Sequence, residues 1–364
     1  MDIQSPVTSL PVTIEVLSPV HIGDGGVLKR SLDFVVHGGR TYVIHIDRYA
    51  RWAYGEMSGK DWMNVPPGDI LHDYSPEALD VFRYRMSGAP EKDEVRTFEK
   101  NGFGLPYLPG STLKGMLRTA FIWGLYAAQE KKPDLDRLGK SRSFAGQPVE
   151  REMIGSDPNR DLFRAVHVRD SQPPKTGDLR VVSVDIYPTS HGDGAGAVTA
   201  CEAAPEGMVF ETTIALDSYG FRDKPAADLG WSGKAHWVTP GVLAQMGRAF
   251  AEQRLRQELE YFADREDTKI VRGFYRSELV KRFNSLGENQ FLAQIGWGTG
   301  WNSKTLNDLL LADPRRFARI VQQYKLKRNA AAFAPGDRFP KSRHLLRSQG
   351  QPVRPMGWVL VTVG

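Results

Sequence analysis

The sequence predicts an α+β fold that is ferredoxin-like and carries helical insertions. Short runs of alternating apolar residues indicate strands, and two long amphipathic segments indicate helices. Their order along the chain is strand, long helix, strands, second long helix and strand. This is the order of a βαββαβ unit with segments inserted between its elements. The length of 364 residues leaves room for a second, degenerate copy in tandem.

The predicted strands are recognised by their apolar alternation. In the first strand, at residues 12–20, Val12, Ile14 and Val16 alternate with polar residues, and Pro19 ends the run. A glycine-rich turn follows at residues 21–26. The remaining strands are expected at residues 32–36, 42–46, 163–168, 181–186, 208–216, 291–295 and 357–363.

The first long helix is predicted to start at Ser111, which is a favourable N-cap after the turn formed by Pro109 and Gly110. Apolar residues then recur at helical spacing. A second long helix is expected near residues 242–262. A third, near residues 304–324, follows a glycine-rich loop.

Two domains are expected from the length, a ferredoxin-like one at residues 1–230 and a degenerate, helical and basic one at residues 231–364. Residues 47–104 contain many charges and prolines and offer little apolar surface for a core. We therefore interpret them as an insertion, with a helix near residues 72–86.

Charge is distributed unevenly along the chain. The formal net charge is +5, but residues 1–264 sum to −6 and residues 265–364 to +11. Such asymmetry points to a polyanionic partner bound by the C-terminal third. A solvated basic surface is the alternative.

Several classes of protein are excluded or disfavoured. Cys201 is the single cysteine, which excludes a disulfide framework and a cysteine-rich zinc site. The first residues lack a secretory signal, and the most apolar helical stretch, residues 119–128, is far shorter than the roughly 20 residues that span a bilayer. No metal-binding motif is present. We expect a cytoplasmic protein that needs no cofactor or metal and binds no membrane.

The most distinctive motif is the glycine-rich loop of residues 296–305, GWGTGWNSKT. Gly296, Gly298 and Gly300 would let backbone amides approach an anion, and a helix starting near Ser303 would direct its N-terminus at it. Gly300 and Lys304 are not contiguous with each other, so this is no Walker A loop. A structural turn packed by Trp297 and Trp301 is the alternative to phosphate contact.

Further candidate residues each have a structural alternative, which is helix capping for Ser111, a satisfied structural histidine for His21 and turn formation for the aspartates. The loop-to-helix start at residues 109–114 could hold a phosphate on free amides. His21 could act as a general acid or base in RNA cleavage. Asp24 and Asp33 could support metal-assisted cleavage, or stabilise turns.

Taken together and in this order, several segments resemble the RAMP superfamily of CRISPR-associated proteins. They are LSPVHIG (17–23), YLPGSTLKGMLR (107–118), VRDS (168–171) and EAAPEG (202–207). The glycine-rich loop and PMGWV (355–359) look like the type III-A (Csm) subunit at the head of the effector filament. The resemblance spans nearly the whole chain.

This resemblance implies RRM-like RAMP domains and a non-catalytic subunit that caps the filament near the 3′ end of the CRISPR RNA and supports its maturation. The implied partners are CRISPR RNA, complementary target RNA and other Csm subunits, with host nucleases as further candidates. In related backbone subunits an aspartate after the His-Ile-Gly motif cleaves target RNA with a metal, and Asp33 is the nearest match. The loop around Asp193 falls where relatives project a thumb-like hairpin.

Three functions follow as hypotheses. The first is RNA binding, and its candidate residues are His21, Gly23, Gly110, Ser111, Lys114, Arg118, Gly298, Gly300, Lys304, Arg343 and Arg347. The second is a RAMP endoribonuclease that uses His21 or Asp33. The third is an assembly protein whose basic end contacts acidic neighbours.

Overall fold

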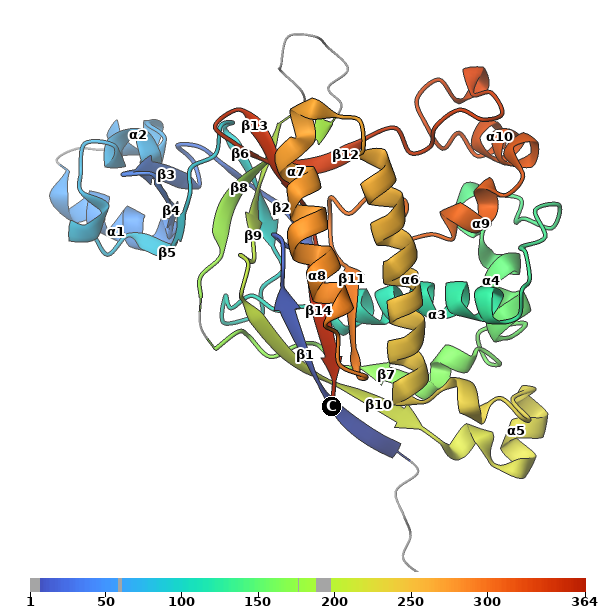
Figure 1. Ribbon diagram of the computed structural model, residues 1–364. Coiled ribbons are helices and arrows are strands. Elements are labelled where there is room, and N and C mark those ends of the chain that lie inside the picture. The colour runs from blue at the N-terminus through green and yellow to red at the C-terminus, as the bar shows by residue number, and fades with distance from the viewer. Residues whose placement is uncertain (1–6, 58–60, 176, 188–197) are drawn as a thin grey trace, which may run out of the picture.

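The computed structural model describes residues 7–57, 61–175, 177–187 and 198–364 (Figure 1). Two β-sheets form its centre. In the first, each strand is antiparallel to its neighbours. Its strands in spatial order are β11 (Gln290–Gln294), β14 (Trp358–Val363), β1 (Val7–Val16), β10 (Val209–Asp217) and β7 (Val166–Val168).

This first sheet confirms the predicted ferredoxin-like α+β class. The chain runs from β1 through α3 (Gly110–Ala128) to β7 and β10, then through α6 (Pro240–Tyr261), and it closes with β14 beside β1. β11 is an additional edge strand. The two long helices cross closely at Gly124 of α3. A Cβ atom at this position would overlap the Met246 side chain of α6, so the close crossing requires glycine.

The second sheet is mixed. Its main path is β2 (Gly23–Lys29), β6 (Glu94–Phe98), β9 (Thr199–Ala203), β8 (Arg180–Tyr187), β5 (Phe82–Ser87), β4 (Arg40–Ile44) and β3 (Phe34–His37). β12 (Arg343–Ser348) pairs with β8 and with β13 (Gln351–Pro355). The C-terminal segment therefore completes a sheet that begins near the N-terminus.

Shorter helices surround the sheets. They are α1 (Ile46–Glu56), α2 (Pro67–Leu71), α4 (Gln147–Ile154), α5 (Asp223–Leu229), α7 (Lys269–Phe274), α8 (Val280–Asn284), α9 (Asn307–Leu311) and α10 (Pro314–Gln323). A π-helical turn, Tyr275–Leu279, joins α7 to α8. No helix within the described ranges is both long and apolar enough to cross a lipid bilayer.

β14 is buried on both faces and links two cores. Val359, Val361 and Val363 pack into the core that includes α3 and the first half of α6. Trp358 and Leu360 point to the other face, where the second half of α6, α7 and the π-helical turn cover them. Strand alternation explains this division. A separate small core lies in the lobe formed by β3, β4, β5, α1 and α2 (left in Figure 1).

The predicted boundary between residues 230 and 231 stays a prediction. β1 lies on one side of it and β14 on the other, and the two strands pair from Val12 with Val363 to Val16 with Val359. The two sides therefore share one sheet and one core. The loop around Asp193 lies outside the described residues.

Three predictions of helices or helix ends are wrong. The helix expected at residues 72–86 is replaced at its end by β5, in which Arg83 and Arg85 alternate with Tyr84 and the buried Met86. The helix expected at residues 304–324 is two helices, α9 and α10. Asp313 caps α10 by accepting the amides of Arg315 and Arg316, and Pro314 cannot continue a helix from α9.

The third wrong prediction is Ser111 as a helix N-cap. α3 begins one residue earlier, at Gly110, and Pro109 occupies the cap position without a side-chain hydrogen bond. The Asp170 carboxylate accepts the Gly110 amide at 2.7 Å instead. The capping group thus comes from a segment 60 residues away.

Candidate nucleic-acid interface

The turn predicted for the segment of residues 21–26 is wrong from Gly23 onward, where β2 begins. This segment and the glycine-rich loop of residues 296–305 form one surface. The Trp297 amide donates a hydrogen bond to the His21 carbonyl at 2.8 Å. Gly296 has a φ of +83°, and a Cβ atom there would lie 2.3 Å from the His21 carbonyl oxygen. This close approach therefore requires glycine. Two motifs that are remote in the sequence are joined through their backbones.

His21 supports this junction from inside. Its side chain is buried, and its Nδ1 lies 2.7 Å from the carbonyl oxygen of Glu202. Because a carbonyl only accepts, Nδ1 carries the proton in this contact. Burial lowers the pKa of His21, so the ring is neutral near pH 7. Its Nε2 faces Gly23, where a Cβ atom would lie 3.0 Å away.

Glu202 holds the strands beneath the surface together. Its buried carboxylate accepts hydrogen bonds from the Tyr84 hydroxyl at 2.6 Å and the Phe98 amide at 2.7 Å, and it pairs with Lys100. Burial and the Glu202 charge raise the pKa of Tyr84. Glu202 belongs to the EAAPEG segment, but the sequence analysis assigned it no role. The signal available in the sequence was an acidic residue among the small, apolar residues that form β9.

Arg96, Trp297 and His344 gather on this surface from β6, the loop and β12. The Arg96 guanidinium lies 5.0 Å from the Trp297 ring centroid. The His344 ring is 4.9 Å from the same Trp297 ring. Sequence reasoning missed Arg96 and His344. Arg96 is exposed in β6 next to the buried Val95, and a charged residue beside an apolar one in a strand could have identified Arg96 as a surface residue.

Lys304 completes the group, and we name Arg96, Trp297, Lys304 and His344 the open cluster. Burial, and then the charges of Arg96 and Lys304, lower the pKa of His344. Lys304 is exposed to solvent, although partial burial lowers its pKa as well. Within the described ranges, no carboxylate lies within ion-pairing distance of Arg96 or Lys304. These cations are free to meet an anion from outside.

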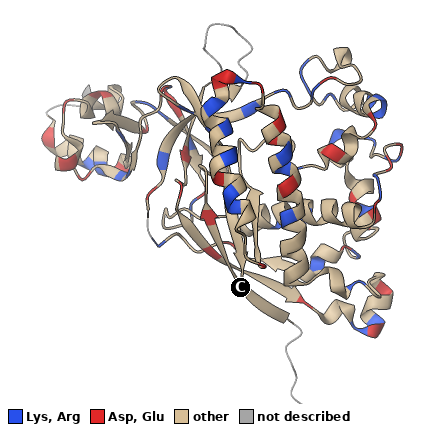
Figure 2. Cartoon of the chain, viewed as in Figure 1, with Lys and Arg blue, Asp and Glu red and all other residues tan. Residues whose placement is uncertain are grey.

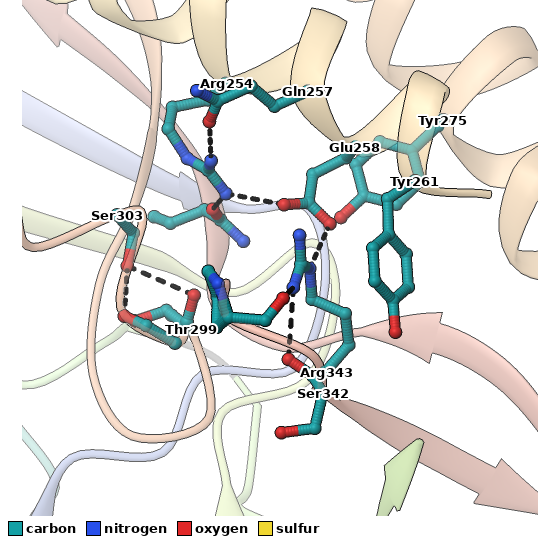
Figure 3. A network of polar contacts seen from close by, with 12 residues as sticks. Arg254, Gln257, Glu258, Tyr261, Tyr275, Thr299, Ser303, Ser342 and Arg343 are labelled. Atoms are coloured by element: carbon teal, nitrogen blue, oxygen red, sulfur yellow. Dashed lines mark hydrogen bonds and ion pairs between the residues drawn. The ribbon is translucent and has the colours of Figure 1, made fainter. Parts of the chain in front are cut away.

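The glycine-rich loop is a compact turn, and the prediction of a helix starting near Ser303 is wrong, since α9 begins at Asn307. The Ser303 hydroxyl bonds to the carbonyls of Thr299 and Gly300 at 3.1 and 3.2 Å (Figure 3). Gly298 and Gly300 have φ values of +84° and +80°. Any anion at this loop would contact backbone amides and Lys304, without a helix N-terminus.

The start of α3 offers fewer free groups for binding a phosphate than the sequence predicted. A Cβ atom on Gly110 would lie 2.3 Å from the Val168 carbonyl oxygen, and Asp170 already occupies the Gly110 amide. Ser111 is exposed, and Lys114 is half-buried, which lowers its pKa. Within the part of the chain that the structure describes, no acidic group pairs with Lys114.

Three of the predicted basic residues have internal partners. Arg118 contacts Glu150 at 2.8 Å and Asp161 at 2.7 Å. Arg347 lies within ion-pairing distance of Glu91 and Asp185, at 3.9 and 3.8 Å. The third, Arg343, is part of a buried network.

In this buried network, which we define as Arg254, Glu258 and Arg343, the carboxylate of Glu258 lies between the two guanidinium groups (Figure 3). Arg254 and Arg343 each donate to it at 2.7 Å. Glu258 is 1% exposed. Although burial opposes ionisation, the two arginines lower its pKa. Tyr261 stacks beside Arg343, with the guanidinium 4.0 Å from its ring centroid.

The two aspartates considered for metal-assisted cleavage are held in structural contacts. Asp33 accepts the Lys29 amide at 2.8 Å in the turn between β2 and β3. Asp24 accepts the Gly26 amide at 2.8 Å and the Thr97 hydroxyl. Considering only the described residues, no cluster of three or more histidine, cysteine, aspartate or glutamate side chains is arranged to hold a metal.

Comparisons with known proteins agree with this architecture. The sequence model of the RAMP superfamily matches residues 13–302. The curated "CRISPR system Cms protein Csm5" of Mycobacterium tuberculosis is 29% identical over 151 residues, which are 38% of each chain. Its counterpart in Methanocaldococcus jannaschii is 24% identical over 184 residues, 45% of this chain and 43% of the relative. The matched regions thus span less than half of these relatives.

Two solved structures share the fold over nearly the whole chain. One chain of the cryo-EM structure of a Csm–crRNA–target RNA ternary complex of a type III-A CRISPR-Cas system has a TM-score of 0.72 and 22% identity. That match covers 98% of this chain and 100% of the other. The crystal structure of T. onnurineus Csm5 has a TM-score of 0.66 and 20% identity, covering 95% and 99% of the two chains.

Proposed function

The chain belongs to the RAMP superfamily, and we propose that it is an RNA-binding structural subunit of a type III-A CRISPR (Csm) effector complex. In this role it acts in the cytoplasm in antiviral defence, binds the 3′ part of the CRISPR RNA, caps the backbone filament and supports maturation of that RNA. Its partners are the CRISPR RNA, complementary target RNA and other Csm subunits. The Csm5 names of its relatives and the Csm complex among its structural neighbours support this assignment.

The observation that carries the proposal is the open cluster beside the joined glycine-rich segments. Arg96 and Lys304 present positive charge without a carboxylate partner in the described chain. The neighbouring loop presents glycine backbone that an RNA strand can approach closely. Phosphate groups dominate affinity for nucleic acids, and such cations provide the matching charge.

A non-catalytic role is also part of the proposal. The proton on Nδ1 of His21 points to a backbone carbonyl, and Asp33 is bonded to the turn that it closes. Both contacts support structural roles. An endoribonuclease would cut guide precursor or target RNA, with metal through Asp33 or without metal through His21. Cleavage that is lost in Asp33→Ala or His21→Ala would overturn the non-catalytic assignment.

The binding proposal is tested by measuring the affinity of the full chain for single-stranded CRISPR RNA as a function of salt. We expect log–log slopes of about −0.7 per phosphate contact, so Lys304→Glu should reduce the slope by about 0.7 or more and weaken binding roughly tenfold. Lys224→Glu is the matched control, because Lys224 is an exposed lysine of α5. Affinity that does not change with salt, or equal effects of the two variants, would contradict the proposal.

A further inference from the structure

His344 occupies an unusual electrostatic position. Its half-buried ring packs against Trp297, and the cationic Arg96 guanidinium packs against the same indole. Both groups are therefore positioned by one aromatic side chain. The charge of Lys304 also acts on the His344 ring. Among the described residues, none hydrogen-bonds to the His344 ring.

The other charged groups around His344 are already occupied. On β8, Asp185 lies within 3.8 Å of Arg347. On β13, Arg354 is paired with Glu278 at 2.9 Å. On the other side of Trp297, the His21 ring donates to a backbone carbonyl. Among the residues that the structure describes, the unbalanced charges that act on His344 are thus the positive ones of Arg96 and Lys304.

We propose that a phosphodiester group of the guide RNA binds between Arg96, Lys304 and His344, and that His344 takes up a proton as the phosphate binds. The inference rests on the proposed RNA-binding function and adds a specific phosphate site and a proton-linked step to it. A phosphate oxygen only accepts hydrogen bonds, and a protonated imidazole offers two donors where the neutral ring offers one. No covalent bond forms or breaks.

The direction of the pH effect follows from the charges. In the free protein, burial and the two neighbouring cations lower the pKa of His344 below its ordinary value of 6.5. A bound phosphate offsets both cations and adds an attractive partner, so it raises the pKa of the ring. Because the bound state holds the proton more tightly, affinity increases as the pH falls. The increase begins below the pKa of the complex and levels off below the pKa of the free protein.

The test uses a hydroxyl-ended oligouridine and the full chain. Uridine takes up no proton near neutrality, and hydroxyl ends avoid a terminal phosphate monoester, which titrates near pH 6. Dissociation constants are measured between about pH 5.5 and pH 8 at constant ionic strength. Calorimetry in buffers of different ionisation enthalpy counts the protons taken up on binding.

We expect wild-type affinity to fall several-fold, at most about tenfold per pH unit, as the pH rises, with uptake of between zero and one proton. His344→Gln should remove most of this dependence. His236→Gln is the matched control, because His236 also lies beside a tryptophan, Trp237, but is exposed and outside the open cluster. It should keep the wild-type pH profile.

Equal pH dependence in wild type and His344→Gln would overturn the inference while leaving the RNA-binding function intact. No oligouridine binding at any pH would overturn both. Proton uptake at His344 with polyglutamate but not with oligouridine would assign the cluster to an acidic protein partner, and would also overturn the inference. If His344→Gln does not fold, the NMR titration of the His344 ring in the wild type decides. Its pKa must rise when oligouridine is added.

Discussion

Arg343 and His344 are consecutive residues of β12, but their side chains enter opposite environments. Arg343 turns into the buried network and binds the Glu258 carboxylate. His344 turns to the other face of the strand and packs against Trp297 in the open cluster. Alternation along a strand explains the separation. The comparison teaches that basic character in a sequence does not distinguish a charge used for stability from a charge available for binding.

The same distinction applies to the basic C-terminal third. The excess of +11 in residues 265–364 suggested a continuous polyanion-binding region. In the structure, α6 carries both acidic and basic positions, whereas α7 and α8 carry basic positions without acidic ones (Figure 2). Arg282 pairs with Glu15, Arg316 with Asp136 and Arg354 with Glu206. Much of the excess therefore neutralises acidic residues of the remaining chain.

The largest effect is expected when the buried network loses its carboxylate. Glu258→Ala leaves the buried Arg254 and the mostly buried Arg343 without their shared partner, so we expect the free energy of unfolding to fall by about 3–5 kcal/mol. Urea denaturation measures this change. The control Glu252→Ala removes an exposed pair with Arg256 and should cost at most about 0.5 kcal/mol. Similar costs for both variants would show that the buried network does not stabilise the fold.

A smaller effect is expected at the junction that holds the open cluster in place. The methyl group added by Gly300→Ala meets open space. The free energy of unfolding should therefore fall only by the roughly 1–2 kcal/mol that a left-handed backbone conformation costs. Gly296→Ala has the same conformational cost and also meets the His21 carbonyl, so it should be more destabilising. Thermal or urea denaturation measures the stability of both variants, and the difference between them gives the cost of the clash with the His21 carbonyl. Equal destabilisation would contradict the close approach of the two segments.

The smallest effect on stability is expected in the open cluster itself. Arg96→Gln removes an exposed cation that packs on Trp297, so we expect a loss of at most about 1 kcal/mol in the free energy of unfolding. RNA affinity should fall about three- to tenfold, with a less steep salt dependence. Glu258→Ala should have the opposite pattern, with a large loss of stability and an unchanged RNA affinity of the molecules that remain folded. A strongly destabilised Arg96→Gln with normal affinity would refute the contrast between the two regions.

The elements that could be predicted were those with clear apolar periodicity. β1, β14, α3 and α6 have patterns that local sequence determines, and their order indicated the ferredoxin-like class. The start of α3 was missed because its capping carboxylate, Asp170, comes from a distant loop. The division of α9 from α10 was readable in principle, since Asp313 followed by Pro314 is a helix start.

The candidate site was predicted only in part. Gly298, Gly300 and Lys304 lie in the glycine-rich loop, which contacts the segment that contains His21 and leads into β2 at Gly23. Their roles in RNA binding stay predictions. Arg96 and His344 were missed because neither belongs to a local motif, and each joins the surface only through strand pairing and contact with Trp297.

The sequence by itself determined the element order, the resemblance to the RAMP superfamily and the presence of a glycine-rich anion-binding candidate. These depend on local periodicity and contiguous motifs. Only the tertiary structure decided which cations are free. Ion pairing depends on distances between residues far apart in the chain, such as Arg343 and Glu258, which are 85 residues apart. Folding pairs Arg343 of β12 with a carboxylate, and it leaves the next residue, His344, near two cations that have no carboxylate partner among the described residues.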